Sequence, residues 1–169
     1  RTRKGMKMEK RISNYEKMKD EMADGFLRYD QEEMIQRYAL AHDEDNLYIS
    51  FLERRYRIDR QTGRVSWTRD DRQTEETADY NEAMTIYDVL CYPREGRRLA
   101  HEWVNVASLS SIQGGTLEKQ GDFFQDAGRK FTGKTDALSR ACEKLGGKKL
   151  EKGDAAYELK LFPFLPLIL

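Results

Sequence analysis

The chain has 169 residues, of which 38% are hydrophobic and 36% charged, a composition typical of one globular domain with a core and a highly charged surface. The 30 Lys and Arg residues balance the 30 Asp and Glu residues, which argues against a dedicated nucleic-acid-binding protein, because such proteins usually carry a basic field. No apolar run reaches the roughly 18–20 residues of a membrane-spanning helix, and the basic N-terminus lacks the apolar stretch of a secretory signal. These features predict a cytoplasmic protein that binds neither membranes nor nucleic acids.

The N-terminal part, about residues 6–41, is predicted to be helical. From Met6 to Phe26 the apolar residues recur every three or four positions, which is the period of a helix with one apolar stripe. Asp30 has the side chain of an N-cap, with Glu33 three residues later as in a capping box, so a second helix is expected to follow. The methionines of this part are interpreted as adaptable core residues, with a methionine-lined binding groove as the alternative.

The apolar period changes to two after the polar segment 42–46, which predicts strands. Apolar residues alternate over 47–51, and two further strands are expected around 56–58 and 65–67. The turn between these two contains Gly63, placed for a positive φ. Residues 47–67 therefore predict an antiparallel meander, and the polar segment 68–77 is predicted to be a mobile connecting loop.

A central helix is expected to begin near Asp79. It contains the most apolar helical stretch of the chain and has apolar residues on nearly every face, which is typical of a buried helix. Pro93 and Gly96 are expected to end it.

The C-terminal part mixes helices and strands. A short strand is expected near 103–106, then helices over 117–131 and 136–145, the second capped by Thr135 and ended by Gly146-Gly147. A half-buried strand is predicted over 155–162. The apolar end, 162–169, is expected to pack against further chain, beyond an incomplete C-terminus, or against a partner.

Taken together, these elements predict the α+β class. Residues 1–169 are expected to form a single domain in which an antiparallel sheet, a hairpin or meander plus the C-terminal strand, is covered by helices.

One motif suggests phosphate binding. Residues 128–135 (GRKFTGKT) match the P-loop pattern, in which Gly128, Gly133, Lys134 and Thr135 would hold phosphates and a metal ion. A P-loop follows a buried strand, whereas the preceding residues have helical spacing and two acids. The segment is therefore interpreted as a joint between two helices, and a phosphate site is kept as the alternative.

A second group of residues is the candidate ligand- or partner-binding site. His101, Glu102 and Trp103 combine a base, an acid and an aromatic surface, and the loop with Gly114 and Gly115 follows them. Trp103 taken alone is interpreted as a core anchor, because large aromatic residues mostly serve in cores. No catalytic residue is predicted.

Cysteine and histidine usage predicts no metal site and no cofactor. Cys91 and Cys142 lie in separate apolar helical patterns, so they are expected to be buried, reduced thiols rather than a disulfide. Two His and two separated Cys do not form the spacing of a zinc site.

Several short motifs, in a fixed order, resemble a known family. They are the hairpin 56–65, RLAHEWV at 98–104, Gly-Gly at 114–115, DFF at 122–124, LGG at 145–147, Gly-Asp at 153–154, and a strand that ends Phe-Pro at 162–163 before Pro-Leu at 166–167. In this order they resemble the bacterial and archaeal DUF3786 domain, over about residues 23–169. The family pattern continues past this point with a Trp and an acidic segment that this chain lacks.

The resemblance implies a setting rather than an activity. The family occurs mainly in anaerobes, and some members are fused to an iron–sulfur domain of the type seen with corrinoid proteins. An iron–sulfur or corrinoid protein is therefore the implied partner. The cysteines of the iron–sulfur domain are missing here, so no cluster is expected.

Three functions follow from these patterns. The first is a non-catalytic ligand- or partner-binding accessory domain in an anaerobic redox or corrinoid-related system. The second is a nucleotide-binding enzyme that uses the 128–135 loop. The third is a homo-oligomeric structural protein, such as a homodimer, that buries the apolar C-terminal strand.

Overall fold

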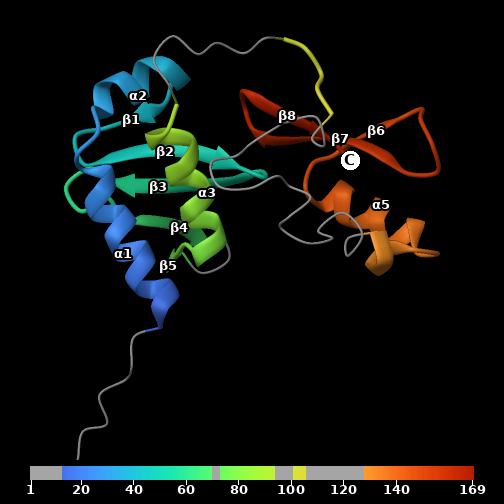
Figure 1. The fold of residues 1–169 in the computed structure, drawn as a ribbon, viewed down its shortest axis with the longest axis horizontal. Coiled ribbons are helices and arrows are strands. Elements are labelled where there is room, and N and C mark those ends of the chain that lie inside the picture. Colours follow the sequence, from blue (N-terminus) through green and yellow to red (C-terminus); the bar gives the residue numbers. More distant parts are fainter. Residues whose placement is uncertain (1–12, 70–72, 94–100, 106–127) are drawn as a thin grey trace, which may run out of the picture. The chain divides into compact units, whose positions relative to one another are not determined.

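The computed structural model describes residues 13–69, 73–93, 101–105 and 128–169 (Figure 1). The chain divides into two compact units. The N-terminal unit comprises residues 1–49 and 54–94, and the C-terminal unit comprises 50–53 and 95–169. The predicted α+β class is confirmed, because each unit combines helices with an antiparallel sheet. The single domain expected from the sequence stays a prediction.

Three helices of the N-terminal unit begin at residues that cap them. α1 (Asn14–Phe26) follows Ser13, and α2 (Gln31–Tyr38) follows the predicted cap Asp30, whose side chain accepts the Glu33 N–H. α3 (Tyr80–Cys91) follows Asp79 and has a complete capping box with Glu82. Capping satisfies N–H groups that the first turn of a helix leaves without partners. The predicted helical residues 6–12 lie outside the described ranges.

The sheet of the N-terminal unit has five antiparallel strands in the order of the sequence. They are β1 (Ala41–His42), β2 (Asn46–Phe51), β3 (Arg54–Asp59), β4 (Val65–Arg69) and β5 (Thr74–Thr77). The predicted meander is confirmed for β2, β3 and β4. Gly63, in the turn between β3 and β4, has the expected positive φ of 70°.

The prediction of a mobile loop over 68–77 is wrong. β4 continues to Arg69, and β5 pairs with it in a register that joins Ser66 to Thr77 and Arg69 to Thr74. Threonine favours strands, and opposite charges that face each other across strands stabilise a sheet. Arg69 lies opposite Thr74 and forms a diagonal ion pair with Glu76 at 3.7 Å. The polar composition of residues 68–77 therefore gave no sign of β5, which is an edge strand of the sheet.

The core of the N-terminal unit lies between one face of the sheet and the helices α1 and α3, which pack side by side (Figure 1). The prediction of a buried helix is confirmed in part. The sheet and α1 cover α3, which has five buried residues, whereas the face with Asn81 and Asp88 is exposed. The buried apolar residues are Ala23, Phe26, Met34, Ile35, Leu40, Leu47, Ile49, Tyr56, Ile58, Val65, Ala78, Ala83, Ile86, Tyr87, Leu90 and Cys91.

The C-terminal unit places α5 (Thr135–Lys144) against a three-stranded antiparallel sheet, in the order β6 (Lys148–Leu150), β7 (Ala156–Phe162) and β8 (Leu165–Ile168). The predicted C-terminal strand, now β7, is confirmed, and it belongs to this second sheet rather than to the meander. The core of the C-terminal unit contains a cluster of Cys142, Tyr157 and Leu159, against which Leu138 and Ala155 pack.

Two local predictions for the C-terminal unit are wrong. Thr135 is the first residue of α5 rather than its cap, and Lys134 occupies the cap position without a side-chain hydrogen bond. Trp103 is 59% exposed and no core anchor, because residues 101–105 form no strand that would hold its ring against a sheet. The cap at Gly146-Gly147 is confirmed: Gly146 has a φ of 70°, and the Gly147 N–H donates to the Cys142 carbonyl at 2.8 Å.

The two thiols have the predicted state, since Cys91 and Cys142 are buried and free. Within the described ranges, no helix has the length and apolar character needed to cross a membrane.

Candidate functional site

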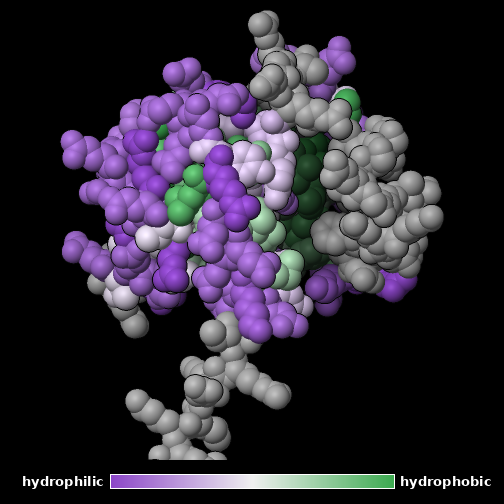
Figure 2. Space-filling model, turned by 60° about the vertical axis from the view of Figure 1, so that its left-hand side comes forward, coloured by the Kyte–Doolittle hydropathy of each residue, from purple (hydrophilic) through white to green (hydrophobic). Residues whose placement is uncertain are grey.

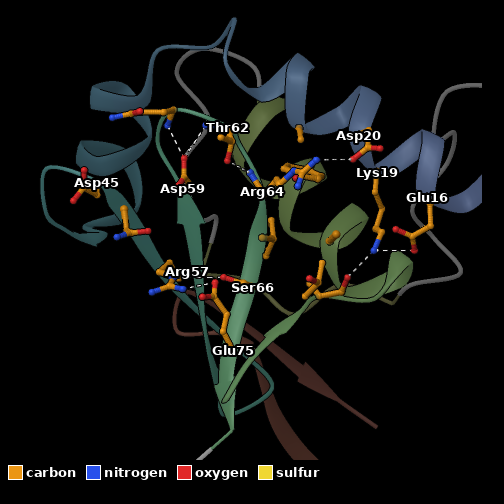
Figure 3. A pocket seen from close by; sticks show the side chains of 18 of the residues that line it. Glu16, Lys19, Asp20, Asp45, Arg57, Asp59, Thr62, Arg64, Ser66 and Glu75 are labelled. Atoms are coloured by element: carbon orange, nitrogen blue, oxygen red, sulfur yellow. Dashed lines mark hydrogen bonds and ion pairs between the residues drawn. The ribbon is translucent and has the colours of Figure 1, made fainter. Parts of the chain in front are cut away.

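A cavity of about 1080 Å³ lies in the N-terminal unit, where α1 and α3 meet the end of the sheet that carries the β3–β4 turn (Figure 3). Residues from several separate segments contribute to it. They are Ser13, Glu16, Lys19, Asp20, Ala23, Asp45, Asn46, Arg57, Asp59, Gln61, Thr62, Arg64, Val65, Ser66, Glu75, Thr77, Ala78, Ala83 and Tyr87.

The β3–β4 turn forms a fixed wall of this cavity. Asp59 Oδ1 accepts the N–H groups of Gln61 and Thr62, at 2.9 and 2.7 Å. Next to them, the Tyr87 hydroxyl of α3 donates to the Gly63 carbonyl at 2.7 Å. The turn is therefore held both from within and by a helix.

α1 contributes a lysine that already has two partners. Lys19 Nζ donates to the Ala78 carbonyl at 3.0 Å and forms an ion pair with Glu16 at 3.1 Å. Its side chain is largely buried, with an exposed fraction of 12%. Lys19 thus joins α1 to the segment that leads into α3.

The strands contribute a second paired cation. Arg57 forms an ion pair with Glu75 across the sheet and donates from Nε to Ser66 Oγ at 3.4 Å. The hydrogen bond from Arg57 holds the pKa of Glu75 below its usual value, so this carboxylate stays ionised. Ser66 therefore lies between the Arg57 guanidinium and the Glu75 carboxylate, and its hydroxyl also lowers the pKa of Glu75.

Arg64 is the most accessible of the three cations in the wall. It follows the turn and lies between Thr62 and Asp20 in Figure 3. Its contact with Asp20 is 3.7 Å long, and both side chains are exposed. Exposed pairs of this kind contribute at most about 1 kcal/mol, so the guanidinium can change partner easily.

The cavity wall has more carboxylates than cations, five against three. Burial acts to raise the pKa of Asp59, but hydrogen bonds from Thr62 and Gln61 outweigh it and keep this pKa below its usual value. Over the part of the chain that the structure describes, the Asp45 side chain forms no hydrogen bond or ion pair. Two negative charges therefore remain unbalanced in the wall.

The remaining wall is polar. Hydroxyl and amide side chains dominate, and the apolar contribution comes from three alanines, Val65 and the ring of Tyr87. No histidine or cysteine is among the described residues that line the cavity. Two hydroxyls there, those of Ser66 and Thr62, donate to Glu75 and Asp59, and the pKa of each of these carboxylates lies below its usual value, which makes it a weak base. The arrangement is suited to binding a polar molecule by hydrogen bonds and charge.

The residues predicted as a ligand or partner site lie elsewhere. His101, Glu102 and Trp103 belong to the C-terminal unit, where they are exposed and outside any helix or strand. Gly114 and Gly115 lie outside the described residues. The site proposed for these five residues stays a prediction.

The residues of the P-loop motif form a joint between two helical segments, as interpreted from the sequence. Gly128 begins a helical segment over 128–131, and α5 begins at Thr135. The N–H groups of Thr132 and Lys134 donate to the carbonyls of Gly128 and Phe131, both at 2.8 Å. A P-loop directs such N–H groups at phosphates, so the geometry gives this alternative little support.

The sequence reasoning did not find the cavity. Its charged residues come from α1, the β1–β2 connection, β3, the β3–β4 turn and β5, and no local motif connects them. The one available signal was the polar face of β3, where Arg55, Arg57 and Asp59 alternate with apolar residues.

The comparisons agree with the resemblance seen in the sequence. The family model described as a domain of unknown function (DUF3786) matches residues 30–169. No match was found among curated proteins or among solved structures.

Proposed function

This chain belongs to the DUF3786 family, whose function is unknown, and we propose that its N-terminal unit is a non-catalytic binding domain for a small organic amine. The observation that carries the proposal is the charge of the cavity wall. Lys19, Arg57 and Arg64 each have a carboxylate partner, and the carboxylates of Asp45 and Asp59 remain to attract a positive group.

The wall also indicates the shape of the ligand. A volume of about 1080 Å³ is slightly above the roughly 300–1,000 Å³ that ligand pockets occupy. Such a cavity accommodates an extended di- or polyamine or an amino sugar, whose further polar groups would meet the hydroxyls of Thr62, Ser66 and Thr77. A flat aromatic cofactor would find few apolar surfaces there.

The accessory role in an anaerobic redox or corrinoid-related system is part of the same proposal. Its support is the family resemblance alone, which implies an iron–sulfur or corrinoid protein as the partner. In this role the domain would bind an amine while a partner protein supplies the redox chemistry.

Calorimetry with spermidine tests the amine directly. We expect spermidine to bind, and neutral sorbitol and inorganic phosphate not to bind. The double change Asp45→Asn and Asp59→Asn should weaken spermidine binding by about tenfold or more, because two charge-assisted contacts are lost. Asn keeps the Oδ1 acceptor that the β3–β4 turn requires, so the fold should remain.

The matched control is Glu44→Gln, which removes a neighbouring exposed carboxylate that does not line the cavity. It should bind spermidine as the unaltered protein does. An equal loss in the control would reduce the effect to general surface charge. Binding of ATP that Lys134→Ala abolishes would instead favour the nucleotide alternative.

A further inference from the structure

The ion pairs that join described residues of the cavity wall differ in how firmly they are held. Lys19 is 12% exposed, and one of its two partners is a backbone carbonyl. Arg57 is 36% exposed and has a side-chain hydrogen bond in addition to its ion pair. Arg64 is 72% exposed, and in the described structure its guanidinium pairs only with Asp20, at 3.7 Å. The Arg64–Asp20 pair is therefore the one that opens most easily.

The backbone is fixed on both sides of this pair. Asp20 lies in the middle of α1. Arg64 follows Gly63, whose carbonyl accepts the Tyr87 hydroxyl of α3 at 2.7 Å. Opening the pair therefore moves two side chains and leaves the cavity wall in place. A site whose backbone is already arranged loses little conformational entropy when a ligand binds.

Asp20 lines the same cavity as the two carboxylates to which the amine is assigned, those of Asp45 and Asp59. In Figure 3, Arg64 lies between Asp59 and Asp20, with Asp45 beyond Asp59. The Arg60 N–H donates to the Asp45 carbonyl at 2.8 Å, which joins the loop of Asp45 to the turn that follows Asp59. Arg64 thus separates two carboxylates that are available to a ligand from a third that it occupies itself.

The pair is also open to water. The Asp20 side chain is 62% exposed. Figure 2, in which the left-hand side of Figure 1 comes forward, shows a surface that is mostly hydrophilic, with hydrophobic atoms in separate patches. A guanidinium that leaves Asp20 at such a surface is hydrated at once, so the exchange carries no large desolvation penalty.

On the basis of the proposed amine-binding function, we propose that Asp20 is a third anionic group of the site and that it makes the site selective for triamines over diamines. Two ammonium groups bind at Asp45 and Asp59. The third takes Asp20 from Arg64, whose guanidinium turns into solvent. A diamine has no third ammonium group and leaves the Arg64–Asp20 pair closed, so it lacks one charge-assisted contact.

An acidic group of a ligand is the other candidate for this exchange, with Arg64 as its partner. Such a group would lie between the carboxylates of Asp59 and Asp20 (Figure 3), which repel it. An ammonium group in the same place is attracted by both. The two directions of exchange predict opposite effects when Arg64 is replaced by a neutral residue.

Calorimetry on the full chain compares spermidine, a triamine, with 1,4-diaminobutane, a diamine. We expect spermidine to bind about tenfold more tightly, because it makes the additional contact with Asp20. Asp20→Asn should weaken spermidine binding by about fivefold or more and should weaken diamine binding much less, so that the preference for the triamine is largely lost.

The effect of Arg64→Gln has the opposite sign. It should tighten spermidine binding by about threefold, because the ligand no longer competes with a guanidinium for Asp20. In the presence of Asp20→Asn the same change should tighten binding much less, since there is no carboxylate to release. Arg28→Gln is the control, because Arg28 is exposed and does not line the cavity. It should bind both amines as the unaltered protein does, and circular dichroism shows that each variant is folded.

The results separate this inference from the function on which it rests. Binding of both amines with a spermidine preference that folded Asp20→Asn retains would overturn the role of Asp20 alone. Weaker spermidine binding by Arg64→Gln would show that Arg64 contacts the ligand itself, which reverses the exchange. Binding of neither amine to the unaltered protein would overturn the proposed function and the selectivity together.

Discussion

Gly63 shows how one residue sets the distance between the β3–β4 turn and α1. Its φ of 70° lies in the left-handed region, and a Cβ there would come within 2.3 Å of the Ala23 carbonyl oxygen. Both the backbone conformation and the close approach require glycine. The hydrogen bond from Tyr87 to the Gly63 carbonyl holds the same turn from α3.

We predict that Gly63→Ala lowers the free energy of unfolding by about 2 kcal/mol or more, because the positive φ disfavours alanine and the contact with Ala23 is backbone, which does not move aside easily. Urea unfolding followed by circular dichroism measures this change. The same variant should weaken spermidine binding, since Thr62 and Arg64 flank the altered residue.

Gly25→Ala is the control for this substitution. Gly25 lies within α1, and a Cβ there would meet nothing within 4 Å. Alanine is a better helix former than glycine, so we expect the free energy of unfolding to stay constant or to rise by up to about 1 kcal/mol. Equal destabilisation by both variants would mean that the turn does not contact α1 as described.

At the scale of elements, we predict different effects on stability for substitutions at the starts of α3 and α5. Asp79→Ala should lower the free energy of unfolding by about 1 kcal/mol, because the complete capping box of α3 is lost. Thr135→Ala should change it by less than about 0.5 kcal/mol, because Thr135 lies inside α5 and caps nothing. Urea unfolding of both variants at neutral pH provides the measurement.

The Thr135→Ala variant also tests where α5 begins. Sequence pattern alone makes Thr135 the cap, and the structure makes it the first helical residue. A loss of about 1 kcal/mol in Thr135→Ala would return the cap to this residue. No loss in Asp79→Ala would show that the α3 box contributes little to stability.

Helices and strands with a strong apolar period could be predicted from the sequence, and polar strands such as β5 could not. The apolar alternation over β2 and the N-cap at Asp30 identify their elements directly, because burial of one sheet face requires the period of two and the first turn of a helix requires a cap. β5 has no buried residue, so nothing in its composition marked it as a strand. Its pairing depends on β4, which is a tertiary contact rather than a local preference.

The candidate sites follow the same distinction. The P-loop motif is a continuous stretch of sequence and so can be recognised from the sequence alone, yet the N–H groups of Thr132 and Lys134 donate to carbonyls within the joint. The cavity depends on Asp45 and Asp59 as well as Arg64, brought together by the meander and its turn. A methionine-lined binding groove, the alternative to a methionine core, stays a prediction.

At the scale of the whole molecule, buried tyrosine hydroxyls and cysteine thiols make the free energy of unfolding depend on pH in the alkaline range. Burial raises the pKa of Cys91 from 9.0 to about 12, and burial together with a hydrogen bond to Glu82 raises the pKa of Tyr56 from 10.0 to about 12. Burial also raises the pKa of Tyr87 and Cys142. In the unfolded chain all four groups titrate near their usual values.

The sign of the effect follows from proton binding. Below pH 9 both states keep the Cys91 proton, so this group adds no pH dependence. Above it the unfolded chain releases the proton while the folded protein retains it, up to about pH 12. The free energy of unfolding therefore falls as the pH rises, by up to about 1.4 kcal/mol per pH unit for each such group.

We predict that urea unfolding measured at a series of pH values shows constant stability near neutral pH and a steep decline above about pH 9. Cys91→Ala should lower stability at neutral pH, because it leaves a small cavity, and should make the alkaline decline shallower by up to about 1.4 kcal/mol per pH unit. A decline of unchanged slope in Cys91→Ala would show that this thiol ionises equally in both states. The buried environment assigned to it at the end of α3 would then be incorrect.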